Sequence, residues 1–130
     1  MKFRHCSYRI LLLVCLNLFC VFLLVGCGAS TATKTENINL KAGEYLSIPV
    51  ILETEDLVEG TFTVQGPTNL DIKFAIQDSS GTTVYGPIQS RSQSFTYRAQ
   101  AEGTHFLYLD NTYSFLNEKS VLLTYTYSER

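Results

Sequence analysis

Cysteine is missing from most of this chain of 130 residues: the four cysteines are Cys6, Cys15, Cys20 and Cys27, and none follows. A disulfide, a CxxC redox pair and a cysteine-ligated metal site are therefore excluded from everything after Cys27. A domain of this size buries about two thirds of its unfolded surface and folds without cross-links. The sequence predicts one domain that is stabilised by packing alone.

Basic residues are also scarce. Lys2, Arg4 and Arg9 precede every acidic residue, which leaves seven Lys and Arg against all 12 Asp and Glu from Cys27 onward, a net charge of −5. Affinity for nucleic acid depends on Lys and Arg that neutralise phosphates. We therefore expect no nucleic-acid binding, and no electrostatic attraction to anionic lipid head groups.

The usual parts of a catalytic or metal site are sparse. His105 is the only histidine after Cys27, and neither a nucleophile-elbow motif nor a Gly-rich phosphate loop is present. We interpret His105 as structural rather than as part of a Ser-His-Asp triad. Glu53, Glu55, Asp56 and Glu59 offer oxygens that a calcium ion prefers, but their spacing matches no EF-hand loop. A solvated acidic loop that discourages edge pairing is the favoured interpretation, and no catalytic residue, metal or cofactor is predicted.

Residues 1–26 have the pattern of an export signal. The first nine residues include Lys2, Arg4, His5 and Arg9, and residues 10–25 are apolar except for Asn17. This apolar run is shorter than the roughly 20 residues that a membrane-spanning helix needs. A basic start, an apolar middle and small residues at the end are typical of a signal peptide.

The tetrapeptide Leu24-Val25-Gly26-Cys27 resembles the lipobox of bacterial lipoproteins. The resemblance implies cleavage before Cys27 and a diacylglycerol on its thiol, and two or more acyl chains anchor a protein stably. The alternative is an uncleaved signal anchor with an incidental cysteine. Both place the rest of the chain outside the cytoplasm, at the cell membrane or the outer membrane. Residues 28–36 are small and polar, and we predict that they form a flexible tether after the lipidated Cys27.

From residue 37 onward, apolar and polar residues alternate with the period of a β-strand. The faces predicted to be buried are Leu46, Ile48, Val50 and Leu52; Phe62 and Val64; Leu70, Ile72, Phe74 and Ile76; Phe95, Tyr97 and Ala99; and Val121, Leu123, Tyr125 and Tyr127. Residues 104–109 are predicted to form a central strand, and Pro49 places its own strand at a sheet edge or a bulge. A short strand at residues 82–85 is expected to end at Gly86-Pro87. The pattern predicts an all-β fold, an antiparallel two-sheet sandwich of seven to eight strands.

The segment from Gly103 to Ser114, GTHFLYLDNTYS, followed by Lys119-Ser120-Val121, resembles the C-terminal signature of GOLD (Golgi dynamics) domains. The resemblance implies a jelly-roll-like sandwich over residues 37–130 that is used for protein or lipid-associated binding and not for catalysis. This chain has a lipobox and lacks the coiled coil and C-terminal membrane helix of the cargo receptors in that group. Their vesicle-trafficking role is therefore not carried over.

The loop from Asp110 to Asn117 is the candidate binding loop. Asp110 and Asn111 suit the end of a strand, because both side chains hydrogen-bond nearby backbone and tolerate left-handed φ. Lys119 is expected to cross the loop and pair with an acidic residue such as Asp110. Tyr113 and Phe115 are predicted to be either binding contacts or caps on the core.

These features together predict a non-enzymatic binding or adaptor domain that is anchored to a membrane through lipid at Cys27 and recognises an unidentified protein partner. One alternative is an accessory structural lipoprotein of an envelope assembly. Another is an unrecognised hydrolase, which we favour least because the chain lacks a recognisable nucleophile and base.

Overall fold

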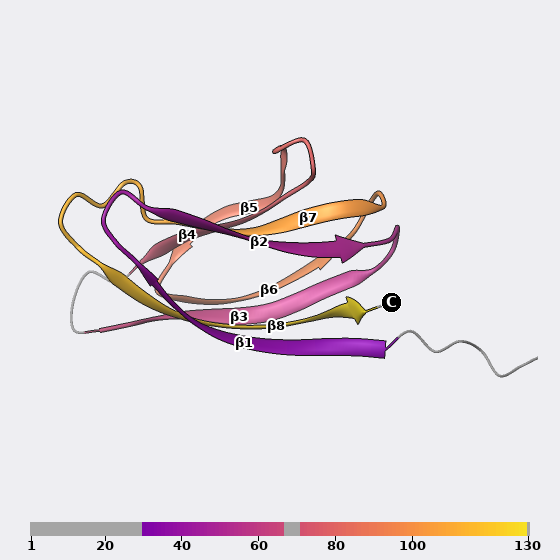
Figure 1. The fold of residues 1–130 in the computed structure, drawn as a ribbon, viewed down its shortest axis with the longest axis horizontal. Coiled ribbons are helices and arrows are strands. Elements are labelled where there is room, and N and C mark those ends of the chain that lie inside the picture. The colour runs from indigo at the N-terminus through magenta and orange to yellow at the C-terminus, as the bar shows by residue number, and fades with distance from the viewer. Residues whose placement is uncertain (1–29, 67–70, 130) are drawn as a thin grey trace, which may run out of the picture.

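The computed structural model describes residues 30–66 and 71–129 (Figure 1). The strands are β1 (Ser30–Leu40), β2 (Tyr45–Leu52), β3 (Leu57–Gln65), β4 (Ile72–Gln77), β5 (Thr83–Ser90), β6 (Ser92–Arg98), β7 (Gly103–Asp110) and β8 (Lys119–Glu129). They form two layers that pack face to face (Figure 1). Within the described ranges, no helix has the length and apolar character needed to cross a membrane.

The two sheets have four strands each. The order is β1-β8-β3-β6 in the first, here called sheet A, and β2-β7-β4-β5 in the second, sheet B. Every neighbouring pair is antiparallel. This order is the connectivity of a jelly roll, in which most consecutive strands lie in opposite sheets. The predicted sandwich is confirmed, as are the central position of β7 and the edge position of β2, the strand that holds Pro49.

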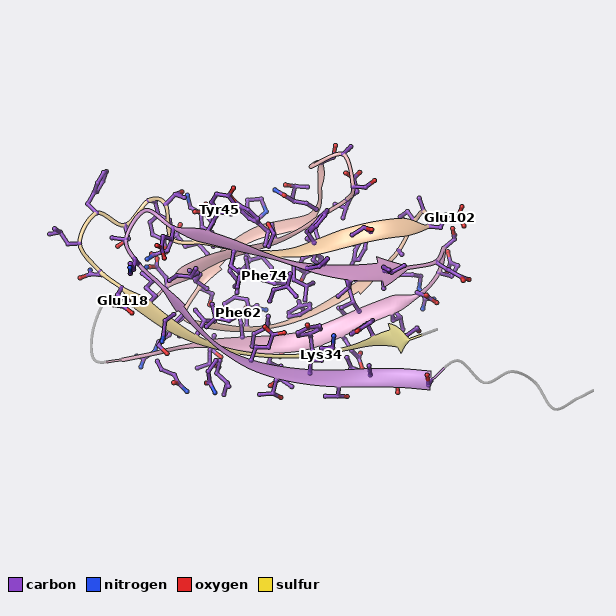
Figure 2. The ribbon with its side chains drawn as sticks, in the orientation of Figure 1. Lys34, Tyr45, Phe62, Phe74, Glu102 and Glu118 are labelled. Atoms are coloured by element: carbon purple, nitrogen blue, oxygen red, sulfur yellow. The ribbon has the colours of Figure 1, made fainter. Side chains whose placement is uncertain are left out.

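The core lies between the sheets and consists of the apolar faces that the alternation predicted. The Phe62 ring of sheet A lies 5.2 Å from the Phe74 ring of sheet B, and Phe74 lies 4.5 Å from Phe95. Figure 2 shows Phe62 and Phe74 between the two layers. Leu70 lies outside the described residues, and Leu46 and Tyr127 pack against the core but are only partly buried. Each fully buried large apolar side chain stabilises the fold by about 1.5–3 kcal/mol.

The tether predicted for residues 28–36 is wrong from Ser30 onward, because β1 begins there and pairs with β8 along eleven register positions. The outward residues in the first half of β1 are Thr31, Thr33 and Thr35, whose β-branched side chains favour strands. The hydroxyl of Thr33 lies 2.8 Å from that of Thr126, and Thr35 lies 3.1 Å from Thr124. Cross-strand hydroxyl pairs therefore hold a segment that has almost no apolar residues to bury.

The strand predicted to end at Gly86-Pro87 continues through these residues as β5, so that prediction is also wrong. The register with β4 shifts between Phe74 and Ile76, and Gly86 and Pro87 occupy the irregularity, with a cis peptide bond between them. Gly86 has a φ of 81°, which suits glycine. Pro87 has no backbone N–H to donate. Because it lies within the irregularity of an edge strand, the hydrogen-bond ladder continues on either side of it.

Candidate functional site

The candidate loop lies at one end of the sandwich, and the start of β1 lies at the other (Figure 1). In the ladder between β1 and β8, Ser30 pairs with Glu129 at one end and Leu40 pairs with Lys119 at the other. A strand of this length spans about 3.4 Å per residue, so the two ends are about 35 Å apart. We call residues 110–118 the distal loop. Cys27 lies outside the described residues.

Asp110 ends β7 by bonding to the backbone just beyond it. Its Oδ1 accepts a hydrogen bond from the backbone N–H of Thr112 at 2.7 Å. Neither Asp110 nor Asn111 has a positive φ, since the only described non-glycine residue that does is Glu55, at 72°. The strand therefore ends as predicted through local side-chain bonding, but without a left-handed residue at the pair.

Asn111 is completely buried and connects two loops. Its Nδ2 donates to the carbonyl oxygens of Leu40, Lys41 and Asn117 at 3.3, 2.9 and 3.0 Å. Its backbone N–H donates to Glu44 at 2.9 Å. One side chain thus holds the turn between β1 and β2 against the distal loop. Buried bonds of this kind restrict the loop to one conformation.

Lys119 does not pair with Asp110, as the sequence had led us to expect; its partner is Asp71. Lys119 lies on the inward face of β8, where its side chain is only 2% exposed, and its Nζ lies 3.1 Å from Asp71 Oδ1. The ammonium also donates to the Tyr113 hydroxyl at 2.9 Å and to the Asp71 carbonyl. The Tyr113 hydroxyl donates to the same carbonyl at 2.8 Å. A buried cation is retained here because three oxygens replace its water.

The hydrogen bonds of this cluster set its protonation states. The Gln89 amide is the largest cause that lowers the pKa of Asp71, to about 2, and hydrogen bonds from Lys119 and Tyr113 add to it against desolvation. Desolvation alone would lower the pKa of Lys119, but its hydrogen bonds with Tyr113 and Asp71 outweigh burial and raise it. Desolvation raises the pKa of Tyr113. At neutral pH the cluster is therefore a carboxylate, an ammonium and a neutral phenol.

The lowered pKa of Asp71 predicts an acid-sensitive part of stability. Because the folded pKa lies below the unfolded value, the contribution is present above about pH 4 and is lost as pH falls toward 2. Asp71 is 41% exposed, so solvent screening limits the contribution to about 1 kcal/mol. We expect the free energy of unfolding of Asp71→Asn to fall less than that of wild type between pH 4 and pH 2. Urea unfolding at both pH values measures this, with Glu118→Gln as an exposed control; an equal fall in Asp71→Asn and wild type would refute it.

Tyr113 and Phe115 have different roles, although the sequence predicted the same two alternatives for both. The Tyr113 ring lies between two ammonium groups, with Lys73 Nζ 4.7 Å and Lys119 Nζ 4.6 Å from its centroid, and it anchors the loop. Phe115 is 90% exposed, and its neighbour Leu116 is 91% exposed. The exposed apolar tip of the distal loop is therefore Phe115-Leu116.

Sequence reasoning missed two residues of this site. Leu116 had a visible signal, because two consecutive apolar residues in a polar loop break the surrounding alternation. Asp71 had none, because it is 48 positions from Lys119 in the chain and follows a Gly-Pro break. Only the folded arrangement of β4 and β8 brings these two charges together.

The remaining candidates have structural roles. His105 is 3% exposed, with Nδ1 3.1 Å from the Gly103 carbonyl oxygen. In the acidic loop, the Glu53 N–H donates to Asp56 Oδ2 at 2.9 Å, and Glu55 pairs with Arg98 at 3.4 Å. Across residues 30–66 and 71–129, no three His, Cys, Asp or Glu side chains are placed to hold a metal ion.

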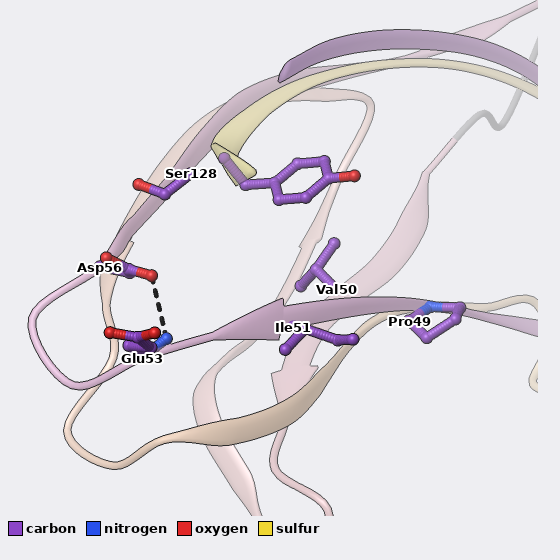
Figure 3. A pocket seen from close by; sticks show the side chains of 7 residues that line it. Pro49, Val50, Ile51, Glu53, Asp56 and Ser128 are labelled. Atoms are coloured by element: carbon purple, nitrogen blue, oxygen red, sulfur yellow. Dashed lines mark hydrogen bonds between the residues drawn. The ribbon is translucent and has the colours of Figure 1, made fainter. Parts of the chain in front are cut away.

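A cavity of about 270 Å³ opens beside the acidic loop, far from the distal loop (Figure 3). Pro49, Val50 and Ile51 of β2 form one wall, and the end of β8 with Tyr127 and Ser128 forms the other. Figure 3 shows the hydrogen bond between Glu53 and Asp56 at its rim. Ser128 is the only hydroxyl-bearing aliphatic side chain of this lining, and no histidine accompanies it. The described lining therefore contains no Ser-His-Asp triad.

The fold and the site define a jelly-roll domain that presents an apolar loop tip on a hydrogen-bonded base. The sequence model of the emp24/gp25L/p24 family, described as GOLD, matches residues 37–130. The chain belongs to this family, and the GOLD resemblance seen in the sequence is confirmed. A GOLD sandwich is suited to a non-enzymatic binding domain. Among curated proteins, no sequence matches.

Three of the solved structures that this chain matches are of bacterial proteins. The periplasmic g-type lysozyme inhibitor PliG of Aeromonas hydrophila has a TM-score of 0.51 and 10% identity, over 78% of this chain and 89% of that one. A protein of Bacillus endospore appendages, described as disulfide-linked pili, has a TM-score of 0.48 and 18% identity, over 82% of this chain and 98% of that one. A carbohydrate-binding module of Cellvibrio mixtus lichenase 5A has a TM-score of 0.37 and 15% identity, over 78% of this chain and 92% of that one. At such identity, the likeness to PliG concerns the fold alone.

Proposed function

We propose that this protein is an exported, lipid-anchored binding domain that captures a protein partner with the tip of its distal loop and performs no catalysis. The observation that carries the proposal is the pair Phe115-Leu116, at 90% and 91% exposure, on a loop that buried polar groups hold in place. Exposed apolar residues at the tip of an ordered loop are typical of binding contacts.

The energetics favour a small apolar pocket on the partner. Burial of one large apolar side chain contributes about 1.5–3 kcal/mol, so a pocket that takes both the Phe115 and the Leu116 side chain gains roughly 3–6 kcal/mol. Asn111, Tyr113 and Lys119 fix the base of the loop, which reduces the entropy lost on binding. The two tip residues would then act as the central anchors of a larger contact.

The geometry also favours a partner on the side away from the membrane. The chain enters the sandwich at Ser30, three residues after Cys27, while the distal loop lies at the opposite end (Figure 1). A lipid on Cys27 would therefore hold the entry end near the bilayer and present Phe115-Leu116 outward. The role of an adaptor fits this orientation, because the anchor and the contact lie at opposite ends.

The double variant Phe115→Ser with Leu116→Ser tests the contact. We expect partner capture from detergent-solubilised membranes to fall at least tenfold, because the variant removes the apolar anchors. Stability should stay within about 0.5 kcal/mol of wild type, since both side chains face solvent. Quantitative mass spectrometry after pull-down measures capture. Ile51→Ser, a 73% exposed apolar residue on β2, is the matched control. Unchanged capture, or a sharp drop in melting temperature, would contradict the assignment.

The anchor is tested in the same cells with Cys27→Ala. Wild type should fractionate with membranes and yield a mature N-terminus that carries diacylglycerol on Cys27. The variant should lose both properties and still capture the partner in solution, because the contact loop is unchanged. A wild-type chain with an intact leader and an unmodified thiol would support the signal anchor instead.

A further inference from the structure

The outward face of sheet A has an unusual regularity. The strand register aligns its outward side chains in rows that cross all four strands. One row is Thr35, Thr124, Thr61 and Ser94, and the next is Thr33, Thr126, Glu59 and Thr96. Seven of these eight side chains are hydroxyls, and the eighth is a carboxylate.

The six row residues on β8, β3 and β6 border a shallow hollow of about 330 Å³ on this face, and the two on β1 lie beyond it. Gly60, Phe95 and Tyr125, which are register partners with their side-chain positions on the inward face, line its floor with their backbone. The hydroxyls nearest β1 bond to each other, as Thr33 does with Thr126. Those of Thr61, Ser94 and Thr96, beside Glu59, make no hydrogen bond with the residues that the structure describes. Their donors and acceptors are therefore available to a ligand.

We propose that this hollow binds a neutral β-1,4-linked polysaccharide chain, which lies across the strands along the two rows. Neighbouring strands are about 4.8 Å apart, close to the rise of one sugar in an extended β-1,4-linked chain of hexopyranoses. Successive sugars would meet successive strands. Glu59 accepts hydrogen bonds from two adjacent sugar hydroxyls, and the hydroxyls of Thr61, Ser94 and Thr96 both donate and accept.

Charge and shape narrow the ligand class. The lining described for the hollow includes the Glu59 carboxylate and no Lys or Arg, so it repels anionic glycans, phosphates and nucleic acids. The twist between neighbouring strands, about 20–25° each, prevents a flat crystalline surface from touching both rows along their length. A single flexible chain of three or four sugars can follow this twist. The site is on a different surface from the distal loop, so it stands independently of the proposed partner contact.

Calorimetric titration of the full chain in a sugar-free detergent tests the proposal, with cellotetraose and the tetramer of β-1,4-linked N-acetylglucosamine as probes. We expect saturable binding with a Kd of about 1 mM or tighter for at least one probe. Thr61→Val keeps the side-chain shape and removes the hydroxyl, and it should raise Kd about three- to tenfold. Glu59→Gln should raise Kd about tenfold or more, because hydrogen bonds to a charged group are stronger.

Three controls make the result decisive. Thr104→Val, on sheet B, should leave Kd unchanged. The α-linked maltotetraose should bind at least tenfold more weakly, because its coiled chain does not follow the rows. Polygalacturonate should not bind. The proposal is overturned if neither neutral probe gives saturable heat, if both hollow variants bind as well as wild type, or if the anionic or α-linked glycan binds equally well.

Discussion

Asn111→Asp is expected to lower the free energy of unfolding by about 3–5 kcal/mol at pH 7. The substitution conserves shape, but it replaces an amide that donates to three backbone carbonyls with a carboxylate that is held against them. The introduced carboxyl resists ionisation in this environment, which raises its folded pKa. The penalty should therefore decrease as pH falls below the folded pKa toward the unfolded value of about 4.

Urea unfolding at pH 7 and pH 4.5 measures this effect. Asn39→Asp is the matched control, because it makes the same chemical change at an exposed position on β1. It should shift stability by no more than about 0.5 kcal/mol at either pH. Equal effects at positions 111 and 39, or a pH-independent loss in Asn111→Asp, would show that the amide does not hold the two loops together.

Gly60→Ala is expected to be comparably damaging, at about 3–5 kcal/mol, for a steric reason. A Cβ at this position would lie 2.9 Å from both the Phe95 ring and the Tyr125 Cα, and would also overlap the Thr124 carbonyl oxygen. Gly60 pairs with Phe95 on one side and Tyr125 on the other, in the middle of sheet A. The backbone of β8 cannot move aside without disturbing the ladders on both of its edges.

The control for Gly60 is Gly43→Ala. Gly43 has a φ of 81° but open space around its Cβ position, so alanine there should cost only about 1–2 kcal/mol for the left-handed backbone. Melting temperatures of the two variants compare steric overlap with backbone strain directly. A Gly60→Ala protein as stable as Gly43→Ala would mean that sheet A yields more easily than its geometry indicates.

Periodicity predicted most of the strands and the faces that they bury. Alternation at residues 46–52 and 121–125 follows from the simple requirement that one face of each sheet excludes water. It does not determine which strands pair, so the jelly-roll order came from the resemblance and not from the pattern. The same reasoning failed for residues 30–36, because it looked for apolar residues while hydroxyl pairs with β8 hold that segment.

The sequence places a loop after Asp110, as the structure does, but it does not predict how the side chains of that loop are arranged. Sequence position alone does not distinguish Tyr113, which bonds inward to Lys119, from Phe115, which faces solvent. The choice depends on where Asp71 lies, and that is set by the packing of the two sheets at this end. Long-range polar contacts of this kind have no period and no local spacing for a sequence to reveal.

The pairing of β1 with β8 has a mechanical consequence. With the N-terminal end held at a membrane and the distal loop held by a partner, tension would run parallel to the strands. The eleven register positions between β1 and β8 would then share the load in shear. Pulling on the two termini would act differently, because Ser30 and Glu129 are register partners at the same end. That force would open the ladder one residue pair at a time. The domain should therefore resist tension between the membrane and the partner far better than a force applied between its two chain ends.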